Sequence, residues 1–141
     1  LFAGTIILLS LALGVPGAQQ WVNDLPNDAN KKYVADFKAK VKTSPSFYGA
    51  QSYDAVGLIN SAVVAAKGDL TKKDAMRAEM RKANYKSVRG PYKYGNKHIP
   101  IQNFYLQDVV KDASGELVLK TVSTIVKDSQ DNFAAKCPMK W

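Results

Sequence analysis

The stretch from Ser87 to Tyr105, SVRGPYKYGNKHIPIQNFY, constrains the fold most, because it separates a helical first part of the chain from an extended second part. Gly90-Pro91 marks a turn, and Pro100 restricts the backbone again, since proline fixes φ and donates no backbone hydrogen bond. The stretch holds the chain's one histidine, His98, and no recognisable catalytic machinery. It predicts two short extended segments joined by a polar loop.

Three helices are expected before this stretch. Asn27-Asp28 is a good N-cap pair, and apolar residues follow it at four-residue spacing, which predicts an amphipathic surface helix. A second helix, from about 50 to 66, is apolar nearly all round and is therefore expected to be largely buried. Lys67-Gly68 is its expected stop, and a third helix is expected over about 72–83.

After Asn84 the pattern changes to strands, expected over 88–94, 99–111 and 116–126. The turn sequence 112–115 joins the last two into a β-hairpin. Helices followed by strands predict a layered α/β domain, and the apolar run 1–7, taken as a strand, favours a largely parallel sheet.

The run 1–15, LFAGTIILLSLALGV, admits two interpretations. Followed by PGAQQ, it has the apolar core and small-residue end of a secretory signal, but it has neither an initiating Met nor a basic segment before it. At about 15 residues it is also shorter than the ~20 that span a bilayer. The competing interpretation, which we favour, is an interior strand over 1–7 that runs into a short helix or loop ending near Gly14 and Gly17.

Charge and cysteine content narrow the function classes. The 20 Lys and Arg exceed the 12 Asp and Glu, for a net charge of +8, but the cations between 72 and 82 alternate with acids on a predicted helix. That is the pattern of a solvated helix face, and no nucleic-acid-binding motif accompanies it, so no nucleic-acid partner is expected. Cys137 has no second cysteine in the chain, so it could pair only with a cysteine outside it.

No enzyme motif is present: the chain has no glycine-rich dinucleotide fingerprint, P-loop, HExxH or GxSxG. His98 has no second His or Cys nearby in sequence to share a metal. We therefore expect no catalytic residue, no metal and no cofactor. A small α/β enzyme that uses His98 stays open as a minor alternative.

Four segments stand in a characteristic order along the chain: WVNDLPNDANKKYVADFKAK, SPSFYGAQSYDAVGLINSAV, SVRGPYKYGNKHIPIQNFY and DNFAAKCPMKW. Together they resemble the periplasmic solute-binding proteins of branched-chain amino acid type ABC importers. The last two look most like the subgroup associated with aromatic and other organic acids.

The resemblance implies a fold of two α/β lobes joined by a hinge, which close on a solute. This chain would supply only the C-terminal portion of that type I fold, as a single segment. Residues of about 1–28 would end the second lobe, 29–104 would return to the first lobe, and 105–141 would form the final strands and tail. Nothing in the chain matches the N-terminal part of the first lobe.

The resemblance also implies three ligand-binding residues. Tyr48 matches an aromatic that often faces the cleft in this family, with Phe47 as its neighbour; the alternative is that Tyr48 packs under its helix. Thr5 lies in the loop where the family often carries an acid that pairs with a substrate ammonium. That loop reads Ala3-Gly4-Thr5-Ile6, with no carboxylate before Asp24, which favours a solute without an amino group.

The resemblance therefore implies a periplasmic, non-enzymatic capture protein for a small carboxylate, either an aromatic acid or a branched-chain amino acid. Its protein partners would be the membrane permease subunits of an ABC importer. The alternative is a ligand-sensing domain of the same fold in a receptor or regulator.

Overall fold

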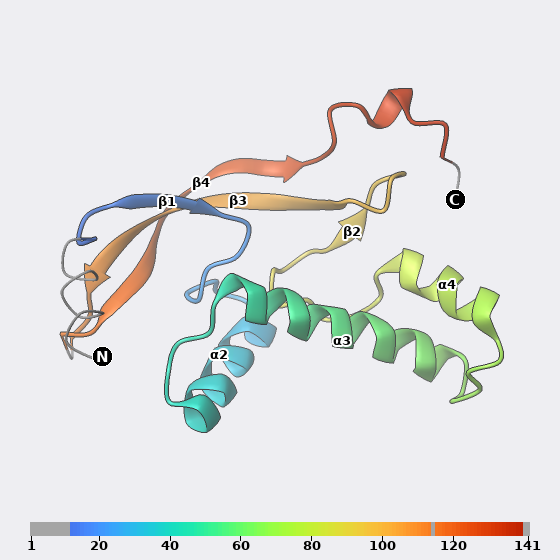
Figure 1. Cartoon of the computed structure of the whole chain (residues 1–141), viewed down its shortest axis with the longest axis horizontal. Helices are drawn as coiled ribbons and strands as arrows, with labels where there is room; N and C mark the ends of the chain where they lie inside the picture. The colour runs from blue at the N-terminus through green and yellow to red at the C-terminus, as the bar shows by residue number, and fades with distance from the viewer. Residues whose placement is uncertain (1–11, 114, 140–141) are drawn as a thin grey trace, which may run out of the picture.

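The computed structural model describes residues 12–113 and 115–139. The expected strand over 1–7 and the candidate residue Thr5 lie outside this part of the chain. A group of helices lies along one side of an open sheet, and a long hairpin extends beyond the helices (Figure 1). Within the described ranges, no helix combines the length and apolarity needed to cross a bilayer.

The three expected helices form. Helix α2 spans Asp28–Val41, and the Asn27 side chain accepts a hydrogen bond from the Asn30 backbone N–H, as an N-cap residue does. Helix α3 spans Phe47–Ala65 and begins three residues earlier than predicted, because Ser46 caps it. Helix α4 spans Lys73–Lys82 and packs against α3.

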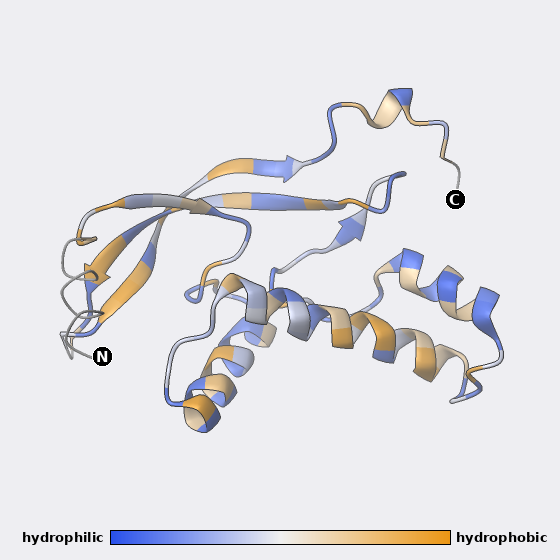
Figure 2. Ribbon diagram, viewed as in Figure 1, coloured by the Kyte–Doolittle hydropathy of each residue, from blue (hydrophilic) through white to orange (hydrophobic). Residues whose placement is uncertain are grey.

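The expectation that the second helix is largely buried is wrong for the described chain. In α3 only Ala50, Asp54 and Ala62 are buried, whereas Val56, Ile59 and Val64 are more than half exposed. In Figure 2 the apolar residues of this helix gather in its C-terminal part, and its first turns are pale or blue. A helix that is apolar all round needs neighbours on every side, and the described elements cover only part of its surface.

The four strands pair antiparallel: β1 (Pro16–Gln19) and β2 (Lys93–Tyr94) lie against β3 (Pro100–Lys111), which also pairs with β4 (Leu117–Ser129). The predicted hairpin is confirmed as β3–β4. The parallel pairing that was expected from the run 1–7 does not occur among the described strands. The predicted strand over 88–94 shrinks to β2, because residues 88–91 turn and Val88 is buried among the helices.

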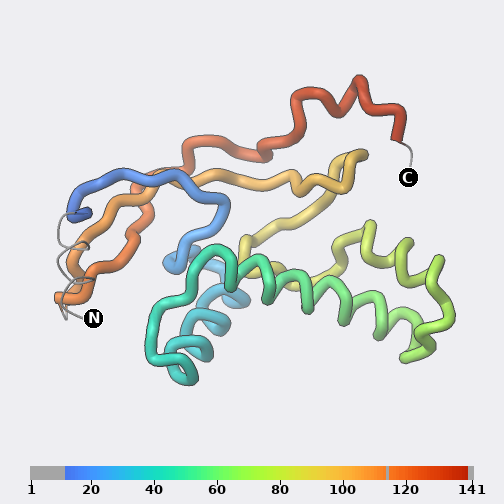
Figure 3. Tube along the Cα trace, in the orientation of Figure 1, coloured from blue at the N-terminus to red at the C-terminus, as the bar shows by residue number. Residues whose placement is uncertain are grey.

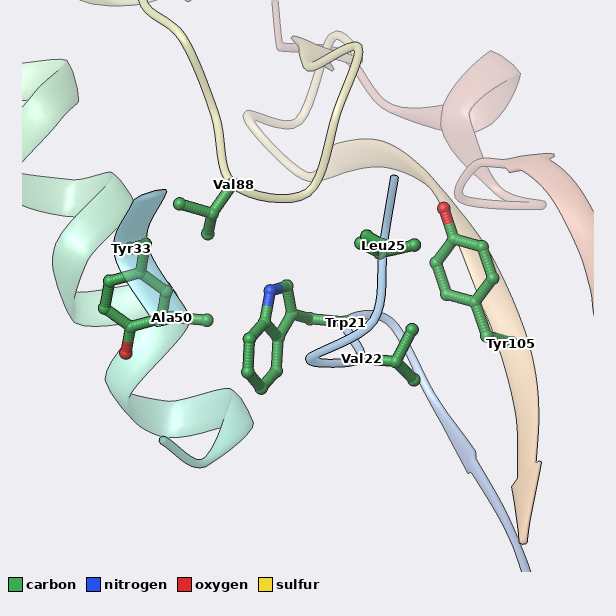
Figure 4. Close-up of a cluster of buried hydrophobic side chains, with 7 residues drawn as sticks. All are labelled: Trp21, Val22, Leu25, Tyr33, Ala50, Val88 and Tyr105. Carbon is green, nitrogen blue, oxygen red and sulfur yellow. The ribbon is translucent and has the colours of Figure 1, made fainter. Parts of the chain in front are cut away.

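The core lies where α2, α3, the loop after β1 and the strand β3 meet (Figure 4). The Trp21 indole fills its centre and meets the Tyr33 ring edge-on at 6.1 Å between centroids. The path of the backbone explains why these elements meet at the core. The chain runs from β1 into α2, and residues 85–92 later return between α3 and the sheet (Figure 3). The buried residues are Trp21, Val22, Leu25, Tyr33, Ala50, Val88 and Tyr105.

The tail carries one short 3-10 turn, Ala134–Lys136, and Cys137 follows it as a free thiol. Asn96, in the turn between β2 and β3, donates a hydrogen bond to the Ala134 carbonyl at 2.7 Å. Lys97 in the same turn pairs with Asp131 at 2.8 Å. These contacts hold the tail against the β2–β3 turn.

Candidate functional site

Asp54 is a fully buried carboxylate near the start of α3, and three donors surround it. The Ser87 hydroxyl donates to one oxygen at 2.6 Å, and the Val88 N–H donates to the other at 2.9 Å. Arg89 Nε also donates to Asp54, at 2.9 Å, in an ion pair whose two side chains are at most 8% exposed. A buried carboxylate needs this degree of pairing, because an unpaired charge in the interior is very costly.

Arg89 also connects α3 to the sheet. Its Nη1 donates to the Gln102 side-chain oxygen on β3 at 3.0 Å, and its guanidinium lies 4.4 Å from the centre of the Tyr92 ring. Its charge is already satisfied by Asp54, and we assign it a structural function: it joins α3, the loop 87–92 and β3. Asp54, in the segment SPSFYGAQSYDAVGLINSAV, and Ser87, Val88 and Arg89, in the segment SVRGPYKYGNKHIPIQNFY, are thus one structural unit.

A second buried polar group joins the loop after β1 to α2. The Asn30 side chain accepts a hydrogen bond from Trp21 Nε1 at 2.7 Å and donates toward the carbonyls of Val22, Asn23 and Leu25. The neighbouring cap residue Asn27 donates to the Val88 carbonyl at 3.1 Å. These hydrogen bonds fix the loop after β1, the start of α2 and the loop at Val88 relative to one another.

Phe47 and Tyr48 are the first two residues of α3, and their rings lie 3.9 Å apart between centroids. Phe47 packs against the core, whereas Tyr48 is 68% exposed and so does not pack under its helix. The first turn of α3 contains no acidic residue that would offset the partial positive charge of the helix N-terminus. The start of α3 therefore combines an exposed aromatic ring with backbone N–H groups that carry a partial positive charge.

His98, the residue of the enzyme alternative, lies in the turn between β2 and β3 and is exposed. Over residues 12–113 and 115–139, no group of three or more His, Cys, Asp or Glu side chains is placed to hold a metal. The structure brings His98 near Arg77 and Arg81 of α4, not near Phe47 or Tyr48. Thr5, the third candidate ligand-binding residue, lies outside the described residues.

Sequence reasoning missed the Asp54 unit. One signal was available: Asp54 is the only charged residue among the 19 of α3. A single acid in an otherwise apolar helix indicates a buried partner, because an isolated buried charge is not tolerated. The partner itself, Arg89, is 35 positions away, and no local pattern points to it.

The family model for periplasmic binding proteins matches residues 2–115. The chain belongs to this family. Its structure also resembles solved ABC-transporter solute-binding proteins. One, from R. palustris and in complex with benzoate, is 30% identical with a TM-score of 0.77, and the match covers 86% of this chain and 32% of that one. No curated protein matches the chain.

A second structure, from Rhodopseudomonas palustris BisB5 and in complex with 3,4-dihydroxybenzoic acid, is 28% identical with a TM-score of 0.74. That match covers 86% of this chain and 33% of the other. A Brucella ovis protein that binds leucine, isoleucine, valine, threonine and alanine shares the fold at 16% identity and a TM-score of 0.70. The matches confirm the type I periplasmic-binding fold, and this chain spans about a third of the length of these relatives.

Proposed function

We propose that this chain is the C-terminal portion of the substrate-binding component of an ABC importer, which captures a small carboxylate between two lobes in the periplasm. The observation that carries the proposal is the match over residues 2–115 to periplasmic binding proteins, together with 30% identity to a benzoate-bound receptor. Capture would proceed by lobe closure around the solute, with no covalent step. The permease subunits of the importer would then receive the solute.

The solute we propose is an aromatic acid, and Tyr48 with Phe47 would form part of its site. Tyr48 offers an exposed ring and a phenol, which suit a solute that is part apolar and part polar. The start of α3 adds backbone N–H groups that favour a carboxylate. Thr5 would face the same cleft from the second lobe, in a loop that lacks an acid for a substrate ammonium.

The exposed side of α3 supports the proposed division into lobes. Val56, Ile59 and Val64 are 66%, 54% and 67% exposed, and such a contiguous apolar face usually marks an interaction surface. We propose that the N-terminal part of the first lobe covers it, since the relatives are about three times as long as the matched segment. Residues 29–104 would then belong to the first lobe, between the end of the second lobe at 1–28 and the final strands of 105–141.

A thermal-shift screen of the full-length protein tests the solute class. Benzoate and hydroxybenzoates are expected to raise the melting temperature by mass action, and leucine and valine are not. Tyr48→Ala should weaken the shift with benzoate strongly and leave the melting temperature without ligand unchanged. A shift with aliphatic amino acids alone would overturn the aromatic solute, and no shift with either class would overturn the receptor assignment.

A further inference from the structure

A hollow of about 440 Å³ lies between α3, α4 and the turn that joins β2 to β3. Leu58 of α3 contributes to it, ten residues after Tyr48, which is about 15 Å along the helix. The hollow is therefore separate from the proposed solute site at the start of α3. Its volume falls within the range of about 300–1,000 Å³ that small-molecule sites occupy.

Two arginines and a histidine, from two elements, line this hollow. Arg77 and Arg81 are four residues apart on α4 and so lie on one face, and His98 approaches from the β2–β3 turn. Arg77 pairs with Asp74 at 2.8 Å, but the Asp74 side chain is fully solvent-exposed. An exposed pair of this kind contributes little free energy, so an incoming carboxylate can replace Asp74 on the guanidinium.

The backbone at His98 has an energetically unfavourable conformation. His98 has φ of 57°, in the left-handed region that residues other than glycine seldom adopt. The turn is closed on both sides, since the His98 N–H donates to the Gly95 carbonyl at 3.0 Å and the Gly95 N–H donates to the Ile99 carbonyl at 2.9 Å. Residues held in such conformations gather at functional sites.

The rest of the lining is apolar, with one phenol. Leu58, Met80 and Tyr94 supply surface for a ring or a hydrocarbon chain. Burial raises the pKa of Tyr94, and a hydrogen bond with Tyr92 raises it further, so its phenol stays protonated. A second hollow of about 260 Å³ shares Leu58 and Tyr94 with the first and continues past Tyr85 and Tyr92.

We propose that this hollow, the α4 pocket, is a second binding site, for a small carboxylate with an aromatic or other apolar body. Arg77 and Arg81 hold the carboxylate, His98 closes the rim, and Leu58, Met80 and Tyr94 contact the apolar part. The site uses none of the residues assigned to the cleft. It stands or falls independently of the proposed function.

Proton NMR of the full-length protein tests the α4 pocket, with the ring resonances of His98 as the reporter, assigned by their loss in His98→Gln. Benzoate is expected to shift these resonances saturably. Neutral benzamide should not, because it lacks the charge that the guanidiniums hold. Arg77→Gln with Arg81→Gln should weaken the apparent affinity at least about tenfold, since a hydrogen bond to a charged group contributes about 1.5–3 kcal/mol.

Two variants serve as controls. Lys72→Gln with Lys73→Gln removes the same charge from the start of α4 and should leave the benzoate response intact. Tyr48→Ala should leave it intact as well, whatever it does to the cleft. The proposal is overturned if benzoate causes no saturable shift, if benzamide acts equally, or if the double arginine variant responds like the unmodified protein. A response to a glutamate-rich peptide in place of benzoate would also overturn it and indicate an acidic protein partner.

Discussion

Asp54 on α3 and Arg89 in the loop after α4 form an ion pair at 2.9 Å, with the carboxylate 1% and the guanidinium 8% exposed. The two residues are 35 positions apart in the sequence, and Gln102 extends their connection to β3. It holds the start of α3, and therefore Phe47 and Tyr48, at a defined place relative to the sheet.

Asp54→Asn should destabilise the protein by about 3 kcal/mol, because Arg89 keeps a buried charge without its counter-ion. Urea unfolding followed by circular dichroism measures this. Asp36→Asn is the matched control, since Asp36 also pairs with a cation at 2.8 Å but on the exposed face of α2. It should leave the unfolding midpoint in place. Equal effects of the two substitutions would show that the buried pair does not hold α3.

Gly49→Ala should cost about 1–3 kcal/mol, although alanine normally favours a helix. A Cβ at Gly49 would lie 2.8 Å from the Tyr33 hydroxyl oxygen, and the Tyr33 ring is fixed by Trp21, Phe37 and Tyr53.

Tyr33→Phe should relieve the Gly49→Ala defect. The Tyr33 hydroxyl is buried without a hydrogen-bond partner in the described structure, so its removal alone should be neutral or stabilising. A double-mutant cycle of urea midpoints checks both statements. Additive effects of the two substitutions would contradict the contact.

Phe47→Ala and Tyr48→Ala should differ in their effect on stability, because the two adjacent side chains differ in burial. Phe47 packs on the core, so its truncation should cost about 2–4 kcal/mol. Tyr48 is mostly exposed, and its truncation should change stability by less than about 0.5 kcal/mol. Thermal unfolding of the two variants measures the difference. A large loss from Tyr48→Ala would mean that its ring packs against the protein.

Stability should fall as the pH rises above about 10. Burial raises the pKa of Tyr85, Tyr92 and Tyr94 above the usual value of 10.0. The unfolded chain therefore releases these protons first, so the contribution to stability is complete below pH 10 and is lost as the pH climbs toward the folded values.

Tyrosinate absorbance during an alkaline titration follows this transition. Tyr85→Phe should make the stability less dependent on pH above 10, because phenylalanine does not ionise. An identical profile for Tyr85→Phe would contradict the assignment.

Local sequence signals predicted the elements that local chemistry controls. Asn27 as an N-cap, the stop at Lys67-Gly68 and the turn at 112–115 all act within a few residues, and α2, α3 and the β3–β4 hairpin follow from them. Strand β1 was missed because PGAQ contains residues that strands disfavour, and it forms only by pairing with β3, far along the chain.

The site was less predictable than the fold. The resemblance indicated Phe47 and Tyr48, and the structure shows how they differ in burial, but their contact with a solute stays a prediction. The Asp54–Arg89 pair and the α4 pocket depend on long-range packing, which a single sequence does not encode in any local pattern. The burial of α3 was overestimated because apolar composition does not say which partner covers a helix.

Among the described residues, strand β4 pairs with β3 on one edge and has no partner on the other, and it carries exposed Leu119, Val122 and Ile125. An unpaired strand edge of this kind is a template for the edge of another molecule. The Thr121 N–H is withdrawn from such contact because it donates to Asp24, and Lys120 and Lys127 add repulsion between copies. Because salt screens this repulsion, the protein should self-associate more readily at high ionic strength, and dilute low-salt buffer is the condition that keeps it dispersed.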